Sequence, residues 1–203
     1  MTATLHIGDL PAGLDFGSCV AIDTETMGLD LHRDRLCVAQ LSAGDGTAHV
    51  VHFPDRRYEA PNLKALLADP RVTKLFHFAR FDIAMLSRHL GVVCRPVWCT
   101  KVASKLVRTN SDRHGLKDLC RELLGVELSK QQQTSDWGAA GLSPEQVAYA
   151  ASDVLYLHGL RERLEDLLDR EGRRALAEAC FRFLPDRAAL DLAGWEREDI
   201  FAH

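Results

Sequence analysis

The chain has 203 residues, of which 46% are apolar and 27% are charged, with a formal net charge of -4 and a pI near 6.1. Its length predicts a single domain over residues 1–203, and its mild acidity excludes a general basic surface that holds long nucleic acids through many phosphates. The six cysteines form no CxxC pair, which favours reduced, buried thiols over a disulfide framework or a zinc site.

Three apolar segments near the start predict strands, at residues 19–22, 36–41 and 49–53. Turn-forming residues separate them, among them Gly28 and Gly44, so we predict an antiparallel three-strand meander. A short amphipathic helix follows at 62–67, and the segment 72–77 predicts a fourth, buried strand.

The rest of the chain has mostly helical periodicity, at 82–90, 98–107, 116–124 and in one long helix from Ser143 to about Glu171. Ser143, Pro144 and Gln146 form a capping signal at its start. Its predicted buried stripe comprises Ala150, Val154, Leu157, Leu160, Leu164 and Leu167. The layout predicts an α/β fold, with a mixed central sheet flanked by helices. Neither a signal peptide nor a membrane span is indicated, so we expect a cytoplasmic protein.

The first predicted strand runs into two acids in the sequence VAIDTET, residues 20–26. Side chains alternate along a strand, so Asp23 and Glu25 project from one face while Thr24 points away. Two carboxylates this close repel each other, and a metal ion between them would relieve the repulsion. Taken alone, the pair has a second interpretation, as the polar end of a strand before the turn at Met27.

Two more acids have notable positions in the sequence. Asp82 lies where the fourth strand passes into a helix, and Asp153 lies four residues after Tyr149 on one helical face. Each has an ordinary alternative: Asp82 as an acid favoured by the helix dipole, Asp153 as a solvated helix residue, and Tyr149 as a half-buried aromatic. Their joint placement with the VAIDTET pair favours one shared site.

The segments IDTET, HFARFD (77–82) and YAASD (149–153) resemble the three exonuclease motifs of the DEDD superfamily, in its tyrosine-containing branch. That branch includes ribonuclease D and polymerase proofreading domains. The resemblance implies an RNase H-like fold over about residues 16–170. RTNSDRHGLKDLC (108–120), SKQQQTSDW (129–137) and the ending DLAGWEREDIFAH further resemble the nano-RNase C family of compact, ring-forming octameric enzymes for very short RNAs. We expect no added helical domain of the ribonuclease D type.

This resemblance implies phosphodiester hydrolysis with two divalent ions, Mg²⁺ or Mn²⁺. Asp23 would bridge both ions, Glu25 and Asp153 would complete the site of the water-activating ion, and Asp82 would act largely through a water molecule. Tyr149 would orient the attacking water, since its ordinary pKa of about 10 makes it a poor base. The products would be nucleoside 5′-monophosphates released from the 3′ end.

Residues expected to contact substrate are Thr24, Met27, Leu29, His77, Arg113, His114 and Lys117. Leu29 resembles the apolar wedge that separates the last two bases in related oligonucleotidases, or it is a turn leucine over the core. His77 positions the 3′ nucleotide, or it is a satisfied core histidine. The last three residues belong to a basic stripe with Lys101, Lys105 and Arg108, which is either a local phosphate-binding patch or a solvated face.

Two further segments have open roles. The polar loop 129–133 would reach phosphate, a neighbouring subunit or water. The tail 171–203 is rich in apolar residues, which would cover the core or form subunit contacts. These residues are Phe181, Phe183, Leu184, Leu190, Leu192, Trp195, Ile200 and Phe201.

The function expected from these motifs is 3′-to-5′ exoribonuclease activity on very short RNA oligonucleotides, especially dinucleotides. One alternative is a general 3′-to-5′ exonuclease that trims longer RNA or DNA ends. Another is an inactive RNase H-like scaffold that binds nucleic acid or a protein partner. The expected partners are short RNA, DNA ends under the first alternative and, by resemblance, other copies of the chain in an octameric ring.

Overall fold

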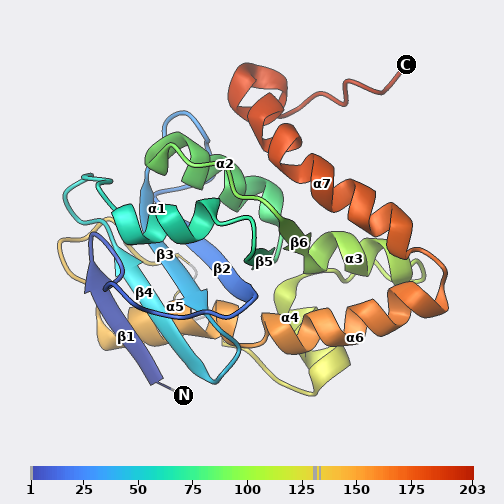
Figure 1. Cartoon of the computed structure of the whole chain (residues 1–203), viewed down its shortest axis with the longest axis horizontal. Coiled ribbons are helices and arrows are strands. Elements are labelled where there is room, and N and C mark those ends of the chain that lie inside the picture. Colours follow the sequence, from blue (N-terminus) through green and yellow to red (C-terminus); the bar gives the residue numbers. More distant parts are fainter. Residues whose placement is uncertain (1, 130–131, 133) are drawn as a thin grey trace.

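The structure is a computed structural model that describes residues 2–129, 132 and 134–203. Within these residues a mixed sheet has the strand order β1-β4-β3-β2-β5-β6 (Figure 1). Its strands are β1 (Thr2–Ile7), β2 (Cys19–Thr26), β3 (Leu36–Ser42), β4 (Thr47–His52), β5 (Thr73–Phe76) and β6 (Val97–Cys99). The predicted antiparallel meander is confirmed as β2, β3 and β4, and the predicted fourth strand is β5, which runs parallel to β2.

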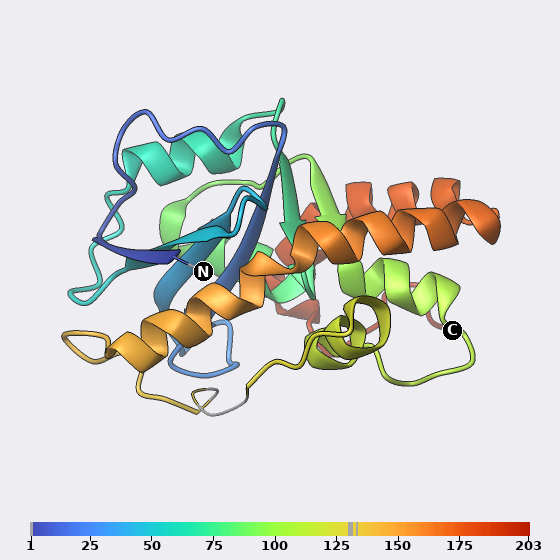
Figure 2. The ribbon, with the colours of Figure 1, turned by 90° about the horizontal axis from the view of Figure 1, so that it is seen from below.

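Helices cover both faces of this sheet, and α1 and α5 lie on opposite faces (Figure 2). The helices are α1 (Pro61–Ala68), α2 (Ala79–Leu90), α3 (Thr100–Val107), α4 (Leu116–Leu119), α5 (Pro144–Leu155), α6 (Leu157–Arg170) and α7 (Arg174–Leu190). Two π-helical turns, η1 (Cys120–Leu124) and η2 (Asp191–Trp195), extend α4 and α7. In the described part of the chain, no helix has the length and apolarity needed to cross a membrane. The predicted α/β layout is confirmed.

The two edge strands were not predicted from the sequence. All residues of β1 except His6 are exposed, so this strand lacks the apolar run that marks a buried one. Strand β6 has three residues and pairs with β5 through Trp98 and Cys99. The prediction of a helix over 98–107 is therefore wrong at its start, because a strand this short leaves no alternating pattern.

The predicted long helix is divided at Tyr156, whose backbone (φ -104°, ψ -3°) separates α5 from α6. The two halves pack on different partners, α5 on strands β2, β3 and β4, and α6 on α3 and η1. The capping box at Ser143 is present as predicted. Beyond the break, Leu157, Leu160 and Leu164 are buried as predicted, whereas at the end of the stripe Leu168 is buried and Leu167 is partly exposed.

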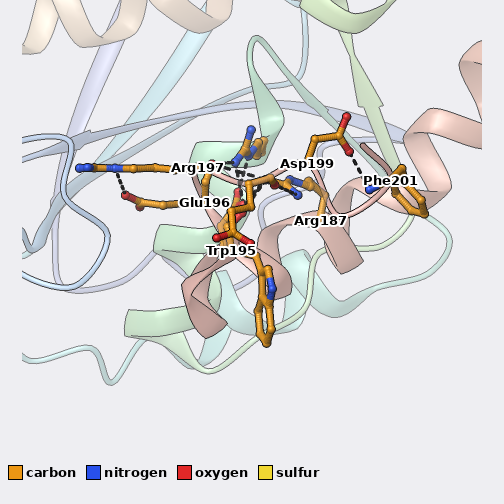
Figure 3. Close-up of polar contacts among 9 residues, drawn as sticks. Arg187, Trp195, Glu196, Arg197, Asp199 and Phe201 are labelled. Atoms are coloured by element: carbon orange, nitrogen blue, oxygen red, sulfur yellow. Dashed lines mark hydrogen bonds and ion pairs between the residues drawn. The ribbon is translucent and has the colours of Figure 1, made fainter. Parts of the chain in front are cut away.

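The apolar tail divides into a core part and an exposed part. Phe181 and Leu184 are buried where α7 packs on α2, α3 and β6, so this part covers the core. Phe183, Trp195 and Phe201 are exposed. Figure 3 shows the end of the chain folded back on α7, where Arg187 donates hydrogen bonds to the carbonyls of Trp195 (2.9 Å) and Glu198 (3.2 Å).

The cysteines are free thiols, as predicted, and most of them are buried. Cys180 is exposed, which corrects the prediction of burial for that residue. It lies on the side of α7 that faces solvent, while the core-facing side of that helix carries Ala177 and Phe181.

A buried ion pair ties the tail to α2 and gives a stability prediction. Asp191 is 2% exposed and accepts from Arg80 Nη2 (2.7 Å), with Arg187 Nη2 3.1 Å away. Asp191→Asn removes the charge that compensates two arginines, so we expect a loss of about 2–3 kcal/mol in the free energy of unfolding by urea, discounted because Arg80 is partly exposed. Asp186→Asn, in the exposed pair with Arg95, should cost about 0.5 kcal/mol or less. Equal losses in the two variants would contradict this account.

Candidate active site

Three carboxylates from two elements meet in space. Asp23 and Glu25 come from β2, Asp153 comes from α5, and one oxygen of each lies within 4.8 Å of the others. Alternation along β2 turns Asp23 and Glu25 to one face, and the ladder with β3 is irregular between Glu25 and Thr26. Helix α5 packs on β2, β3 and β4, which brings Asp153 against this face. The fold therefore unites residues that are about 130 positions apart in sequence.

Asp82, the fourth predicted carboxylate, lies beside this cluster and is not part of it. It is 3% exposed in the first turn of α2, and its Oδ1 accepts a hydrogen bond of 2.7 Å from Thr24 Oγ1. Burial is the main cause that raises the pKa of Asp82, and repulsion from Asp23 adds to it. The Thr24 hydroxyl, predicted to contact substrate, is thus hydrogen-bonded to a carboxylate.

The pKa values of the clustered carboxyls reflect burial and like charge. Burial raises the pKa of Asp23 to about 7. The pKa of Glu25 rises to about 10, first through burial and then through repulsion by Asp23 and Asp153. Burial and Asp23 also raise the pKa of Asp153, and the positive charge of Lys117 opposes that rise. Without a cation, these carboxyls tend to keep their protons near neutral pH, where free carboxyls have already lost theirs.

The cluster opens into a cavity of about 560 Å³. The residues that line it are Asp23, Thr24, Glu25, His77, Gly115, Leu116, Lys117, Asp118, Arg121, Glu127, Leu128, Tyr149 and Asp153. Its walls come from β2, from the residue after β5, from the α4 region and from α5. Three of the four predicted carboxylates and Tyr149 therefore share one concave, polar pocket with further charged groups at its edge, and Asp82 does not line it.

Tyr149 and His77 both line this cavity as neutral groups. Burial and the charges of Asp153 and Glu25 raise the pKa of Tyr149 above its ordinary value, so the phenol keeps its proton at neutral pH. Burial lowers the pKa of His77 to about 3, and its Nδ1 lies 2.8 Å from Thr100 Oγ1. His77 is thus anchored by a hydrogen bond and is part of the cavity wall, and its role in positioning the 3′ nucleotide stays a prediction.

Among the predicted substrate contacts, Lys117 lines the cavity. Arg113 and His114 do not line it; His114 Nδ1 lies 2.8 Å from Ser104 Oγ on α3. Leu29 is 81% exposed and Met27 is 52% exposed. The interpretation of Leu29 as a turn leucine over the core is therefore wrong.

Parts of the predicted basic stripe are engaged within the protein. Lys101 Nζ lies 4.3 Å from the ring centroid of Phe78, and Arg108 forms an ion pair with Glu122. The predicted polar loop 129–133 lies partly outside the described residues, at 130, 131 and 133. Its possible contacts stay a prediction.

Two features near the cluster were missed in the sequence. Gln40 is fully buried on β3, and its Nε2 lies 3.5 Å from Asp23 Oδ2. The signal was present, since a lone amide interrupts the apolar segment 36–41. At the cavity edge, Arg121 Nη2 donates to Asp118 Oδ1 at 2.7 Å, a contact that i, i+3 spacing on a predicted helix could have indicated.

This donor set fits hard divalent cations. Clustered carboxylate oxygens are the ligands that Mg²⁺ and Mn²⁺ prefer, and no sulfur or imidazole ligand is part of the set among the described residues. A bound cation would replace the protons that the raised pKa values retain. Asp23, Glu25 and Asp153 are the residues positioned to hold it.

The raised pKa of Glu25 predicts how stability depends on pH. Below pH 4.5, the ordinary pKa of this side chain, Glu25 is protonated in both the folded and the unfolded protein. At higher pH the unfolded chain loses this proton while the folded protein keeps it, so the contribution of Glu25 to the free energy of unfolding is lost as pH rises toward the folded pKa of about 10. In EDTA, the free energy of unfolding should fall by on the order of 1 kcal/mol per pH unit between pH 7 and 9. Glu25→Gln should flatten this slope, and Mg²⁺ should restore stability at pH 9. If the free energy of unfolding of the wild type falls with pH no more steeply than that of Glu25→Gln, the raised pKa of Glu25 is refuted.

Comparison with known proteins agrees with this geometry. Brucella melitensis NrnC with bound Mg²⁺ superposes with a TM-score of 0.96 at 56% identity, covering 100% of both chains. The same protein bound to pGG gives a TM-score of 0.97 at 57% identity, covering 100% of this chain and 99% of the other. Escherichia coli RNase D superposes with a TM-score of 0.72 at 26% identity, over 84% of this chain and 45% of that one. The predicted RNase H-like exonuclease fold is confirmed.

Sequence comparison points to the same family. Ribonuclease D of Granulibacter bethesdensis is 36% identical over 181 residues, which are 88% of this chain and 45% of that protein. The chain thus spans about half the length of the curated ribonuclease D proteins that it matches. The 3′-5′ exonuclease family matches residues 9–169. The chain therefore belongs to the 3′-5′ exonuclease family, with ribonuclease D and NrnC among its relatives.

Proposed function

We propose that this protein is a 3′-to-5′ exoribonuclease that uses two divalent cations to hydrolyse very short RNA, especially dinucleotides, to nucleoside 5′-monophosphates. The observation that carries the proposal is the set of three carboxylates from β2 and α5 in one cavity. Family membership supports the reaction class. The single domain and the cytoplasmic location remain predictions.

Asp23, Glu25 and Asp153 would hold the cations, with Asp82 supporting them from its buried position. When bound, Mg²⁺ or Mn²⁺ supplies positive charge to the reacting phosphate and lowers the pKa of water. Tyr149 keeps its proton because its pKa is raised. It therefore acts as a hydrogen-bond donor and acceptor that orients water or phosphate, and not as a general base.

Three observations support short substrates. The cavity of about 560 Å³ is of a size that encloses a small ligand and leaves little room for folded RNA. The net charge of -4 disfavours a long phosphate track. The third observation is that Brucella melitensis NrnC, which is similar to this chain along its full length, has a structure bound to pGG.

Leu29 and the basic residues would set how the substrate lies. An 81% exposed leucine beside an exposed methionine is suited to pack against bases, which supports the wedge role. Lys117 at the cavity wall supports a phosphate contact, and Arg113 and His114 would contribute from beside the mouth. Exposed Trp195 and Phe201 on the tail support subunit contacts in a ring.

The ribonuclease D relatives favour the alternative of a general exonuclease for longer ends. A length series separates the two proposals. Purified protein with Mg²⁺ is given 5′-labelled RNAs of two to about twenty nucleotides and matched DNA. We expect dinucleotides to be consumed fastest. We also expect the longer labelled RNAs to become shorter from their 3′ ends. Equal rates at every length would favour the general exonuclease, and no hydrolysis at any length would favour an inactive scaffold.

Substitutions at the cluster test the assigned roles. Asp153→Asn should reduce turnover of a dinucleotide on the order of 10³-fold or more, because it removes a cation ligand. Tyr149→Phe should reduce kcat roughly 10- to 100-fold with little change in KM, because the water loses its orienting partner. Asp166→Asn, an exposed acid on α6, is the control and should match wild type. Full turnover by a folded Asp153→Asn variant would remove the proposed cation site.

A further inference from the structure

Gln40 is a fully buried amide that faces the carboxylate cluster. It lies on β3, whose residues are all buried, directly opposite Asp23 in the antiparallel ladder with β2. Opposed residues in such a ladder project from the same face of the sheet. The Nε2 of Gln40 accordingly lies 3.5 Å from Asp23 Oδ2, at the upper limit of a hydrogen bond.

The protein gains little folding energy from this amide. Its Oε1 is buried and has no hydrogen-bond partner among the described residues, which costs about 1–3 kcal/mol. On the same face of the sheet, Val50 lies opposite it on β4 and Val38 lies two positions before it on β3, and both are fully buried. An apolar side chain would suit these surroundings better. The contact with Asp23 is therefore the feature that distinguishes Gln40 from its neighbours.

Another buried polar residue on the same strand provides a contrast. Ser42 lies two positions along β3, on the same face, and is also fully buried. Its Oγ donates to the carbonyl of Thr47 at 2.7 Å and accepts from the amide of Gly44 at 3.1 Å. Ser42 thus closes the turn between β3 and β4. Gln40 makes no such backbone contact among the described residues.

We propose that Gln40 is a positioning residue for the cation site, which holds one oxygen of Asp23 and so fixes the orientation in which Asp23 shares a cation with Glu25 and Asp153. This inference rests on the proposed function. A neutral donor is suited to the task, because a lysine or arginine in its place would neutralise the carboxylates and compete with the cation. Residues that hold metal ligands commonly change metal affinity or activity 10- to 100-fold when replaced.

Gln40→Met tests the proposal, since methionine keeps the length of the side chain and removes the amide. Mn²⁺ binding is measured from the loss of the free-ion signal in electron paramagnetic resonance, and hydrolysis of a 5′-phosphorylated GG dinucleotide is measured against Mg²⁺ concentration. We expect roughly 10-fold weaker Mn²⁺ binding and a matching rise in the Mg²⁺ needed for half-maximal rate. KM at saturating Mg²⁺ and the melting temperature in EDTA should stay near wild-type values.

Ser42→Ala is the matched control, because it alters a buried polar residue on the same strand and face without contact to Asp23. It should bind Mn²⁺ as wild type does. The amide of Gln40→Asn is too short to reach Asp23, so this variant should bind Mn²⁺ as weakly as Gln40→Met does. It tests the positioning role if Gln40→Met does not fold. Wild-type Mn²⁺ affinity in a folded Gln40 variant, or failure of both variants to fold, would overturn the positioning role. Wild-type protein that neither binds Mn²⁺ nor hydrolyses the dinucleotide would instead overturn the proposed function.

Discussion

Repulsion among three partly buried carboxylates is the constraint on which the rest of the site depends. Asp23, Glu25 and Asp153 offer oxygens within 4.8 Å of one another, and burial removes the water that would screen them. Such a cluster persists because the surrounding fold holds it in place. Strand β2 lies inside the sheet between β3 and β5, and α5 packs across three strands. The folding energy of this core stabilises an arrangement that its own charges oppose.

Two neutral side chains contact the acids of the site, and one cation, Lys117, acts on Asp153 through its charge. The Thr24 hydroxyl donates a hydrogen bond to Asp82 and the Gln40 amide faces Asp23, whereas arginines such as Arg33, Arg71 and Arg174 pair with acids outside the cluster. The C-terminal tail helps to hold α2, which carries Asp82, in place. Arg80, two residues before Asp82, is held by Asp191 and by the carbonyl of Glu196, so the end of the chain helps to fix the first turn of α2. Neutral contacts leave the negative charge of the cluster available to cations.

Much of the fold and the cluster could be predicted because the responsible signals are local. The meander left three apolar segments in the sequence, and the start of α5 left its capping residues. Strand β1, with its exposed side chains, and β6, with three residues, left no periodic pattern. The break at Tyr156 arises from the different partners of α5 and α6, which are tertiary contacts. The bond between Thr24 and Asp82 likewise depends on how α2 packs against the sheet, so the sequence alone did not reveal it.

The most direct test of the account is anomalous diffraction from crystals of the protein grown with Mn²⁺. A metal site made by this cluster predicts a strong anomalous peak bounded by Asp23, Glu25 and Asp153, and a second peak nearby would support the proposal of two ions. Crystals soaked at millimolar Mn²⁺ that have no peak in this pocket, or whose peaks lie elsewhere on the molecule, would contradict the claim that these carboxylates form a cation site.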